Sequence, residues 1–408
     1  MRCKARHGSN MGIYTVSTKR DSSLRLRFPA VAVQALLVLV ALQFPVTGHC
    51  DSGSGWLKNL LASKGKNMKE VAKEIATLNE SEEILGIDFS PDGKYLVAAG
   101  ENGGAIHVWD WQNKKLVHTL VKARGAYTGL VAEPIRYSPD GHLLAACHSL
   151  ALGDVVVRIW DTGTWEIVHD ITNPQKGGGC SAIGFTPDGK SLIQVLDRLP
   201  EFPGDTLIIY STDTWQPVWG LRTVPFQLGA LAISPDGKFI ALGGRLYDFS
   251  PTAAGLSVVE ATKEMFKRKI QRQIAIVDMA QRAIIRTIPV TKMNELSVGR
   301  LAWSPDGANI TIAGAGAVEV FDVHTGKQVA GELLESAEMF VRYTPDGKYL
   351  LESDNDGLGN GLGVKIWDGL RRKLLQKIPG DLSSLVVSRD GHYFAYSGVG
   401  KISVWQLK

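Results

Sequence analysis

An acidic segment near the C-terminus has the spacing of a calcium-binding loop. Glu352, Asp354 and Asp356 alternate and Gly357 follows them, so oxygen ligands would precede a glycine bend. The glutamate that completes such a loop at its twelfth position is replaced by Gly363. We therefore interpret the segment as a glycine-rich loop and assign no metal ligands in it, with a bound Ca²⁺ ion as the alternative.

Single acidic residues recur in segments between the predicted strands, and an enzyme would need several of them to converge at one point. The candidates are Glu101, Asp154, Asp197, Asp205, Asp248 and Asp354. The nine histidines form no ligand set, and the sequence has no zinc-protease motif, glycine-rich phosphate loop or Gly-x-Ser-x-Gly elbow. We predict no catalytic residue and no cofactor, and we expect the protein not to be an enzyme.

Charge is divided unevenly along the 408 residues. Residues 1–48 carry seven Lys or Arg and one Asp, a net charge of +6, and the whole chain carries +4, which leaves −2 for the rest. A nucleic-acid-binding face must be basic, and the mildly acidic body gives no sign of one. The basic stretch 263–272 is interpreted as a solvated helix face, with a site for an anionic surface as the alternative.

The first 48 residues have the pattern of a secretory signal. A basic flank precedes an apolar stretch at Ala30–Phe44, and small residues end at Gly48. We assign 1–48 as a signal peptide, with an uncleaved membrane anchor or a lipid-modified Cys50 as alternatives. We assign 49–68 as a linker, with a docking segment as the alternative. Because a signal and an anchor both export the body, we expect a periplasmic or secreted protein.

One four-residue motif, Ser/Thr-Pro-Asp-Gly, recurs seven times at spacings of 40–70 residues. Ser or Thr opens it, Pro presets the backbone of the second position, and the final Gly allows the positive φ of a turn. The Asp at the third position occurs in every copy and is therefore assigned a structural role. Short apolar runs flank each copy, which predicts a β-hairpin around every turn. The copies begin at Ser90, Ser138, Thr186, Ser234, Ser304, Thr344 and Ser388, the last with Arg389 in place of Pro.

Two further strands follow each hairpin. The third ends in an aromatic or apolar residue that is usually followed by Asp, and in six of the units a fourth apolar run comes after a short turn. Four strands in each of seven units predict an all-β fold, a seven-bladed β-propeller of four-stranded antiparallel blades. The Trp-Asp pairs at Trp109, Trp160 and Trp367, together with the repeated turns, resemble the WD40 repeat family over about residues 69–408.

The resemblance implies a non-catalytic interaction scaffold, here an exported one of bacterial type. The Gly-His dipeptide that usually precedes the first strand in this family is missing from every unit, so we expect its histidine-centred network not to form. The family's Asp between the second and third strands has matches only at Asp154 and Asp205. The alternative function is an enzyme with a metal site at the axial channel mouth, as in propeller lactonases or quinoproteins.

The seventh unit ends at Lys408 after its third strand, which leaves that sheet without an outer strand. Residues 69–78 resemble the fourth strand of the first unit. We therefore predict that an N-terminal strand, about Glu74–Leu78, closes the last blade. An amphipathic helix is the alternative when this segment is read alone.

Two pairs of residues occupy related positions in adjacent units. Cys147 and Cys180 fall in a second strand and in the first strand of the following unit, where a disulfide and two buried free thiols are both open. His118 and His169 occupy equivalent positions in fourth strands, which marks them as repeat residues.

The connections opposite the repeated turns differ in length from unit to unit, and binding residues concentrate in long loops on a rigid scaffold. Unit four carries the largest insertion, about 247–272, with helical spacing. We predict that this loop face binds a partner protein or peptide, with a tolerated surface insertion as the alternative. We expect a monomer that binds no nucleic acid and contacts a membrane only through an uncleaved N-terminal segment. The predicted partner-binding residues are His148, Asp154, Asp197, Arg198, Asp205, Tyr247, Phe249, Phe266, Asp354 and Asp356.

Overall fold

The computed structural model describes residues 70–100, 106–120, 135–149, 155–172, 178–198, 205–222, 226–246, 271–290, 300–337, 340–355, 361–369, 371 and 373–408. All regular secondary structure in these residues is β-strand, which agrees with the all-β class predicted from the repeated turns. Within the same residues, no helix has the length and apolarity needed to cross a membrane. The predicted signal, the linker and the insertion up to residue 270 lie outside the described residues.

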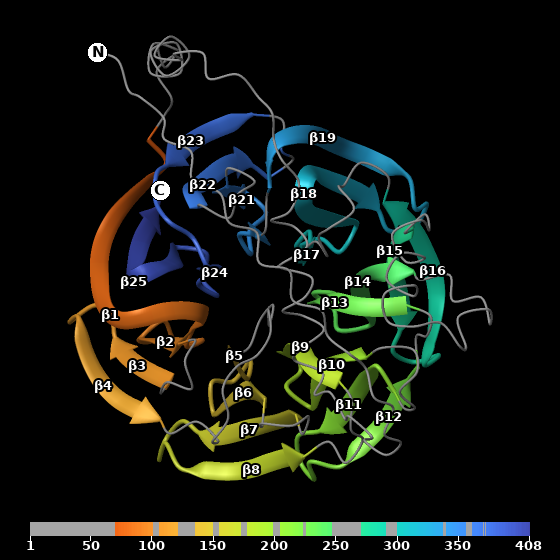
Figure 1. Ribbon diagram of the computed structural model, residues 1–408, viewed down its shortest axis with the longest axis horizontal. Helices are drawn as coiled ribbons and strands as arrows, with labels where there is room; N and C mark the ends of the chain where they lie inside the picture. Colours follow the sequence, from red (N-terminus) through yellow and green to blue (C-terminus); the bar gives the residue numbers. More distant parts are fainter. Residues whose placement is uncertain are drawn as a thin grey trace, which may run out of the picture. The chain divides into compact units, whose positions relative to one another are not determined.

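The strands pair into antiparallel sheets, which follow one another around a circle in Figure 1. One sheet combines both ends of the described chain: β24 (Ser384–Val387), β25 (Tyr393–Leu407), β1 (Ala72–Phe89), β2 (Tyr95–Gly100), β3 (Ile106–Asp110) and β4 (Lys115–Leu120). The next contains β5 (Ile135–Tyr137), β6 (Leu143–Ser149), β7 (Val155–Asp161) and β8 (Ile167–Thr172). It is followed by β9 (Gly178–Phe185), β10 (Ser191–Arg198), β11 (Leu207–Ser211) and β12 (Pro217–Leu221).

The remaining sheets repeat this order from the centre outward. One contains β13 (Phe226–Ile233), β14 (Phe239–Leu246), β15 (Gln271–Asp278) and β16 (Ala283–Val290). A sheet with one long central strand contains β17 (Arg300–Trp303), β18 (Asn309–Asp322) and β19 (Gln328–Ala337). The last contains β20 (Val341–Tyr343), β21 (Tyr349–Asn355), β22 (Gly361–Asp368) and β23 (Leu374–Ile378). This arrangement of antiparallel sheets is that of a β-propeller.

Long strands account for the unequal strand numbers of the sheets. The first part of β1, residues 72–83, pairs with β25 with irregular register after Asn79, and its second part, residues 84–89, pairs with β2. Strand β18 likewise pairs first with β17 and then with β19, and β25 pairs first with β24 and then with β1. Each of these three long strands therefore occupies two strand positions, which in the other sheets are taken by two separate strands.

The predicted pairing between the two ends of the body is confirmed. Glu74 lies opposite Trp405 and Leu78 lies opposite Ile402, so the segment is a strand and not the alternative helix. Leu78 and Ile402 are at most 1% exposed, whereas Ile75 on the other face is 36% exposed. Because a strand alternates its side chains between two faces, this register buries one apolar face of the closing strand.

The repeated turns are held by the same hydrogen bonds in all seven copies. The Ser or Thr hydroxyl donates to the Asp carboxylate two residues later, at 2.5–2.7 Å. In the first copy the carboxylate of Asp92 also accepts the backbone N–H of Lys94, and the hydroxyl of Ser90 accepts the N–H of Tyr95. The Gly takes the predicted positive φ, 72° at Gly93. The structural role assigned to the repeated Asp is therefore confirmed.

Apolar side chains fill the spaces between neighbouring sheets. One buried cluster combines Cys147 and Ile159 of the sheet β5–β8 with Ile183 and Leu192 of the sheet β9–β12. Other clusters join neighbouring sheets in the same way, including β25 and β2 through β1. Burial of this surface, at roughly 25 cal/mol per Å², is the main force that holds each sheet against the next.

The outer strands are linked by aromatic contacts that repeat from one unit to the next. The ring of His118 on β4 lies 5.0 Å from the ring of Trp165, and that of His169 on β8 lies 5.6 Å from that of Trp215. Both tryptophans occupy the same place in a turn before an outer strand, with φ of 61° and 57°. The two histidines therefore have equivalent packing roles, as their repeat positions predicted.

Candidate functional site

The predicted partner-binding residues that the structure describes lie at the ends of strands, on the side away from the repeated turns. His148 is in β6, Asp197 and Arg198 are in β10, and Asp354 is in β21. The other predicted members, apart from Asp205, lie outside the described residues: Asp154, Tyr247, Phe249, Phe266 and Asp356. Their assembly into one binding face stays a prediction.

Asp205 is the one member of the predicted set whose side chain the structure places. It is half-buried at the start of β11 and lies against Gly220 of β12, where any larger residue would collide with its carboxylate. The neighbouring Thr206 is fully buried and donates its hydroxyl to the carbonyl oxygen of Leu221 at 3.1 Å. The Asp205 carboxylate is thus positioned by its own sheet at the edge of the predicted loop face.

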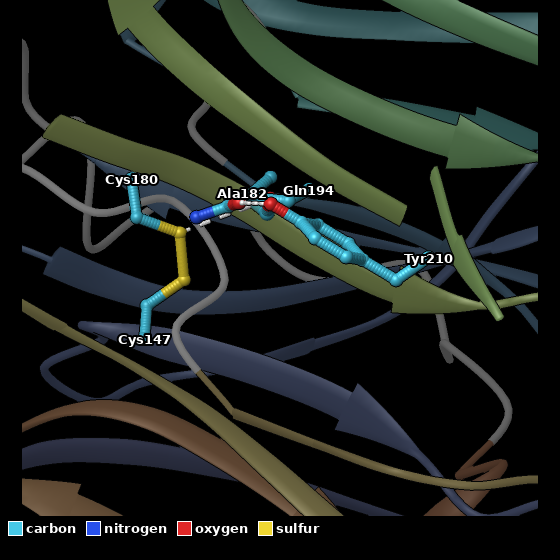
Figure 2. Close-up of a disulfide and its surroundings, with 5 residues drawn as sticks. All are labelled: Cys147, Cys180, Ala182, Gln194 and Tyr210. Carbon is cyan, nitrogen blue, oxygen red and sulfur yellow. Dashed lines mark hydrogen bonds between the residues drawn. A yellow bond between two sulfur atoms is a disulfide. The ribbon is translucent and has the colours of Figure 1, made fainter. Parts of the chain in front are cut away.

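The two cysteines that the sequence left open are joined. Cys147 on β6 and Cys180 on β9 form a disulfide between neighbouring sheets, with Cα atoms 6.2 Å apart. The cysteines are 1% and 6% exposed. Figure 2 shows the disulfide beside Gln194 and Tyr210, whose hydroxyl donates to Gln194 Oε1 at 3.2 Å. A disulfide of this kind persists in oxidising compartments, so its presence bears on where the protein resides.

A buried ion pair lies between β21 and the turn before β23. Glu352 Oε1 accepts a hydrogen bond from Arg371 Nε at 2.5 Å, and the carboxylate is fully buried. The Arg371 guanidinium also lies 4.5 Å from the ring centroid of Trp367. Burial raises the pKa of the Glu352 carboxyl above its ordinary value, while the charges of Arg371 and Lys365 act in the opposite direction. This pair sits within the core and is structural.

A hollow of about 510 Å³ lies on the side of the repeated turns. Its wall consists of the ends of the innermost strands β5, β9, β13, β17 and β20 and of prolines from the turns. Apolar residues border the hollow, and their side chains pack into the clusters between the sheets: Ile183, Phe185, Leu231, Ile233, Leu301 and Trp303. Two arginines, Arg136 and Arg342, line the same hollow. No group of three or more His, Cys, Asp or Glu that could hold a metal ion occurs among the residues the structure describes.

Comparison with known proteins agrees with the repeated architecture. The family pattern "WD domain, G-beta repeat" matches residues 72–110, which cover β1, β2 and β3. SEC12-like protein 2 of Arabidopsis thaliana is 25% identical over 43% of this chain and 41% of that protein. Serine-threonine kinase receptor-associated protein of Gallus gallus is 21% identical over 43% of this chain and 45% of its own. Nuclear distribution protein PAC1 of Gibberella zeae is 28% identical over 31% of this chain and 24% of its own.

The chain therefore carries a match to the WD40 repeat at residues 72–110 and is similar to WD-repeat proteins. It spans less than half the length of each of these three relatives, so their names describe whole proteins that extend beyond the matched region.

A buried polar set lies in the first unit. Glu80 stands where β1 passes from β25 to β2, and its carboxylate is 1% exposed. It accepts a hydrogen bond from Trp109 Nε1 at 2.7 Å and lies 2.7 Å from His107 Nδ1. The tryptophan of the Trp-Asp pair is therefore anchored by a glutamate from the closing strand.

The hollow was missed at the sequence level, although a signal for it exists. The turns of units two and six are each preceded by the dipeptide Arg-Tyr, at Arg136-Tyr137 and Arg342-Tyr343. We assigned the turn side no binding role because its loops are short and uniform. The structure places these two arginines at the same register of two inner strands, on the turn side of the ring.

Proposed function

We propose that residues 69–408 form a seven-bladed β-propeller of four-stranded blades, closed by the first part of β1. The support is a circuit of contacts among the innermost strands. In this circuit each strand contacts the next, in the order β1, β5, β9, β13, β17, β20, β24 and again β1. When the two parts of β1, β18 and β25 are counted separately, the strands form seven sets of four.

We infer that this propeller is a non-catalytic scaffold that binds a partner protein or peptide on its loop face and acts as a monomer. The carrying observation is that the connections following β6, β10, β14 and β21 leave the strand ends opposite the uniform turns and differ in length. A rigid ring with one variable face suits recognition better than a reaction that needs moving catalytic groups. The names of the three relatives state no catalysed reaction.

Shortening the insertion of unit four tests this function. Residues 250–270 would be replaced by a short Gly-Ser linker, and the recovered partner would be titrated against the purified variant and the unaltered chain. We expect at least a tenfold loss of affinity. His142→Ala and Lys238→Ala, at exposed positions beside the turns, are matched controls that should bind normally. Unchanged affinity in a deletion variant with an unchanged melting temperature would refute the loop-face assignment.

We propose in addition that the protein is exported to the periplasm or secreted. The support is the signal-like pattern of residues 1–48 together with the buried Cys147–Cys180 disulfide, since such bonds form where the environment is oxidising. Cell fractionation with intact-mass measurement tests the proposal. A shortened N-terminus in the exported fraction is the expected result, and a full-length cytosolic protein with both thiols free would contradict it.

A further inference from the structure

We propose that the disulfide between Cys147 and Cys180 is a redox-sensitive clamp on one corner of the loop face, the corner formed by the ends of β6, β9 and β10. The oxidised clamp holds these strand ends in one arrangement. A dithiol that reduces it lets the ends separate and weakens partner binding. This inference rests on the proposed function of the loop face and adds its regulation: oxidation after export brings the corner into its binding form.

The disulfide lies next to predicted partner-binding residues. Cys147 immediately precedes His148 in β6. Cys180 of β9 lies opposite Leu196 of β10. The next pairs of this ladder toward the loop face contain two more predicted residues, Asp197 opposite Gly179 and Arg198 opposite Gly178. The backbone that carries these predicted residues is therefore held in place directly beside the bond.

The same two positions join another pair of neighbouring sheets. Cys147 stands nine residues after the start of its turn motif, and Cys180 stands six residues before the next one. Ser397 and Ile84 occupy the equivalent positions in units seven and one, where Ser397 Oγ donates to the carbonyl oxygen of Ile84 at 3.0 Å. This position therefore connects the second strand of one sheet to the first strand of the next. Between units two and three the connection is covalent and can be reduced.

The non-covalent packing around the bond contains an unpaired polar group. Gln194 of β10 is fully buried, and its Oε1 accepts the hydroxyl of Tyr210, which belongs to the same cluster as the two cysteines (Figure 2). Its Nε2 has no hydrogen-bond partner among the residues that the structure describes. A buried donor without an acceptor costs stability, so this interface depends on its covalent bond. The equivalent residue is apolar in four other units: Ala98, Ala146, Leu242 and Ile312.

Opening of the clamp is a thiol–disulfide exchange with a dithiol as the reductant. One thiolate of the reagent attacks the sulfur of Cys180, the more exposed cysteine at 6% against 1% for Cys147. The sulfur–sulfur bond breaks, and Cys147 leaves as a thiolate that takes up a proton. The second thiol of the reagent then displaces Cys180, and the reagent becomes a disulfide. Two electrons and two protons pass in total from the dithiol to the cysteine pair.

Hydrogen–deuterium exchange of the full chain, with and without dithiothreitol, tests the proposal. Cys3→Ser and Cys50→Ser are present in every sample, so that only the pair responds to the reductant. Reduction should make exchange about tenfold faster at residues 145–149 and 178–182, because strand ends that lose a cross-link open locally. The equivalent corner at Ile84 and Ser397 contains no cysteine and is the internal control, where exchange should not change. Unchanged exchange beside the cysteines, or an equal increase at the control corner, would overturn the clamp.

A variant and a binding measurement complete the test. The double variant Cys147→Ala/Cys180→Ala should exchange rapidly at this corner in both conditions, which separates the bond from any other effect of the reductant. The partner used with the shortened insertion should bind the reduced chain about fivefold or more weakly than the oxidised chain. Equal affinity of the two redox forms would refute the regulation. If the shortened insertion still weakens binding in that case, the loop-face function stands and only the clamp fails.

Discussion

The disulfide between Cys147 and Cys180 should contribute a measurable part of the stability of the ring. The bond joins β6 to β9 and so links two neighbouring sheets. Reduction of the bond would remove this cross-link from the unfolded chain. The perturbation is removal of the bond, either by reductant or by the double variant Cys147→Ala/Cys180→Ala. The unfolded chain gains conformational freedom in both cases, which lowers the free energy of unfolding.

The expected magnitude follows from the size of the closed loop. The cysteines are separated by 33 positions. For a loop of this length the chain-entropy relation gives about 3.7 kcal/mol at 25 °C. An unfolding entropy of about 2.1 cal/mol/K per residue over residues 67–408 converts this to a decrease in melting temperature of about 5 °C.

The assay compares urea unfolding of the unaltered chain and of the double variant, each with and without dithiothreitol. Reductant should lower the free energy of unfolding of the unaltered chain by about 3–4 kcal/mol and should leave the double variant unchanged. This design separates the cross-link from the loss of two buried sulfur atoms, because the double variant has the same cavity in both conditions. Titration of thiols in the denatured chain should gain two thiols after reduction.

Two results would refute the reasoning. If reduction adds no thiols, the cysteines are not joined in the purified protein. If reductant shifts the double variant as much as the unaltered chain, the stability change does not come from this bond. A decrease well below 1 kcal/mol with two thiols released would show that the unfolded chain keeps β6 and β9 together without the cross-link.

Three further predictions concern ring closure, the buried ion pair and acid. Leu78→Ala should lower the free energy of unfolding in urea by about 2–5 kcal/mol because Leu78 is 1% exposed, whereas Ile75→Ala on the exposed face of the strand should cost less than about 1 kcal/mol; equal effects would contradict the register. Glu352→Gln should lower the free energy of unfolding by about 3–5 kcal/mol, because it removes the buried carboxylate that pairs with Arg371. Glu70→Gln, in an exposed ion pair, should lower it by less than about 1 kcal/mol. A small loss at Glu352 would argue against a buried charge there. Stability should be constant near neutral pH and fall as the pH drops below about 4, because the Ser or Thr hydroxyl holds the pKa of the turn aspartates below the unfolded value, and that stabilisation is lost on protonation; urea midpoints across pH check this, and a flat profile would contradict it. The aspartates concerned are Asp140, Asp188, Asp236, Asp306 and Asp346.

The repeated turns and their flanking strands were predictable because their causes are local. A hydroxyl, a carboxylate two residues later and a glycine able to take positive φ form the turn wherever they occur, as at Ser90, Asp92 and Gly93. The closing strand was predictable for a different reason. Its apolar pattern matched that of a fourth strand, and one register buries Leu78 while leaving Ile75 exposed.

The candidate sites were less predictable because they depend on residues far apart in the chain. The spacing of Cys147 and Cys180 fitted both a disulfide and two free thiols, since only the packing of β6 against β9 sets the distance between them. Glu352 was interpreted as part of a loop with calcium-like spacing, but its side chain lies in the core with Arg371. An alternating acidic pattern does not show which of its side chains will face the core once the segment forms a strand.

By itself, then, the sequence determined the unit of this protein: a hairpin around a hydroxyl–carboxylate turn, two further strands, and an N-terminal segment shaped to complete the last sheet. Only the tertiary structure decided which units meet. It joined Cys147 to Cys180 and brought Arg136 and Arg342, 206 positions apart, to the wall of one hollow. The physical reason is that a turn is fixed by neighbours along the chain, whereas a site at the centre of a ring exists only once the ring has closed.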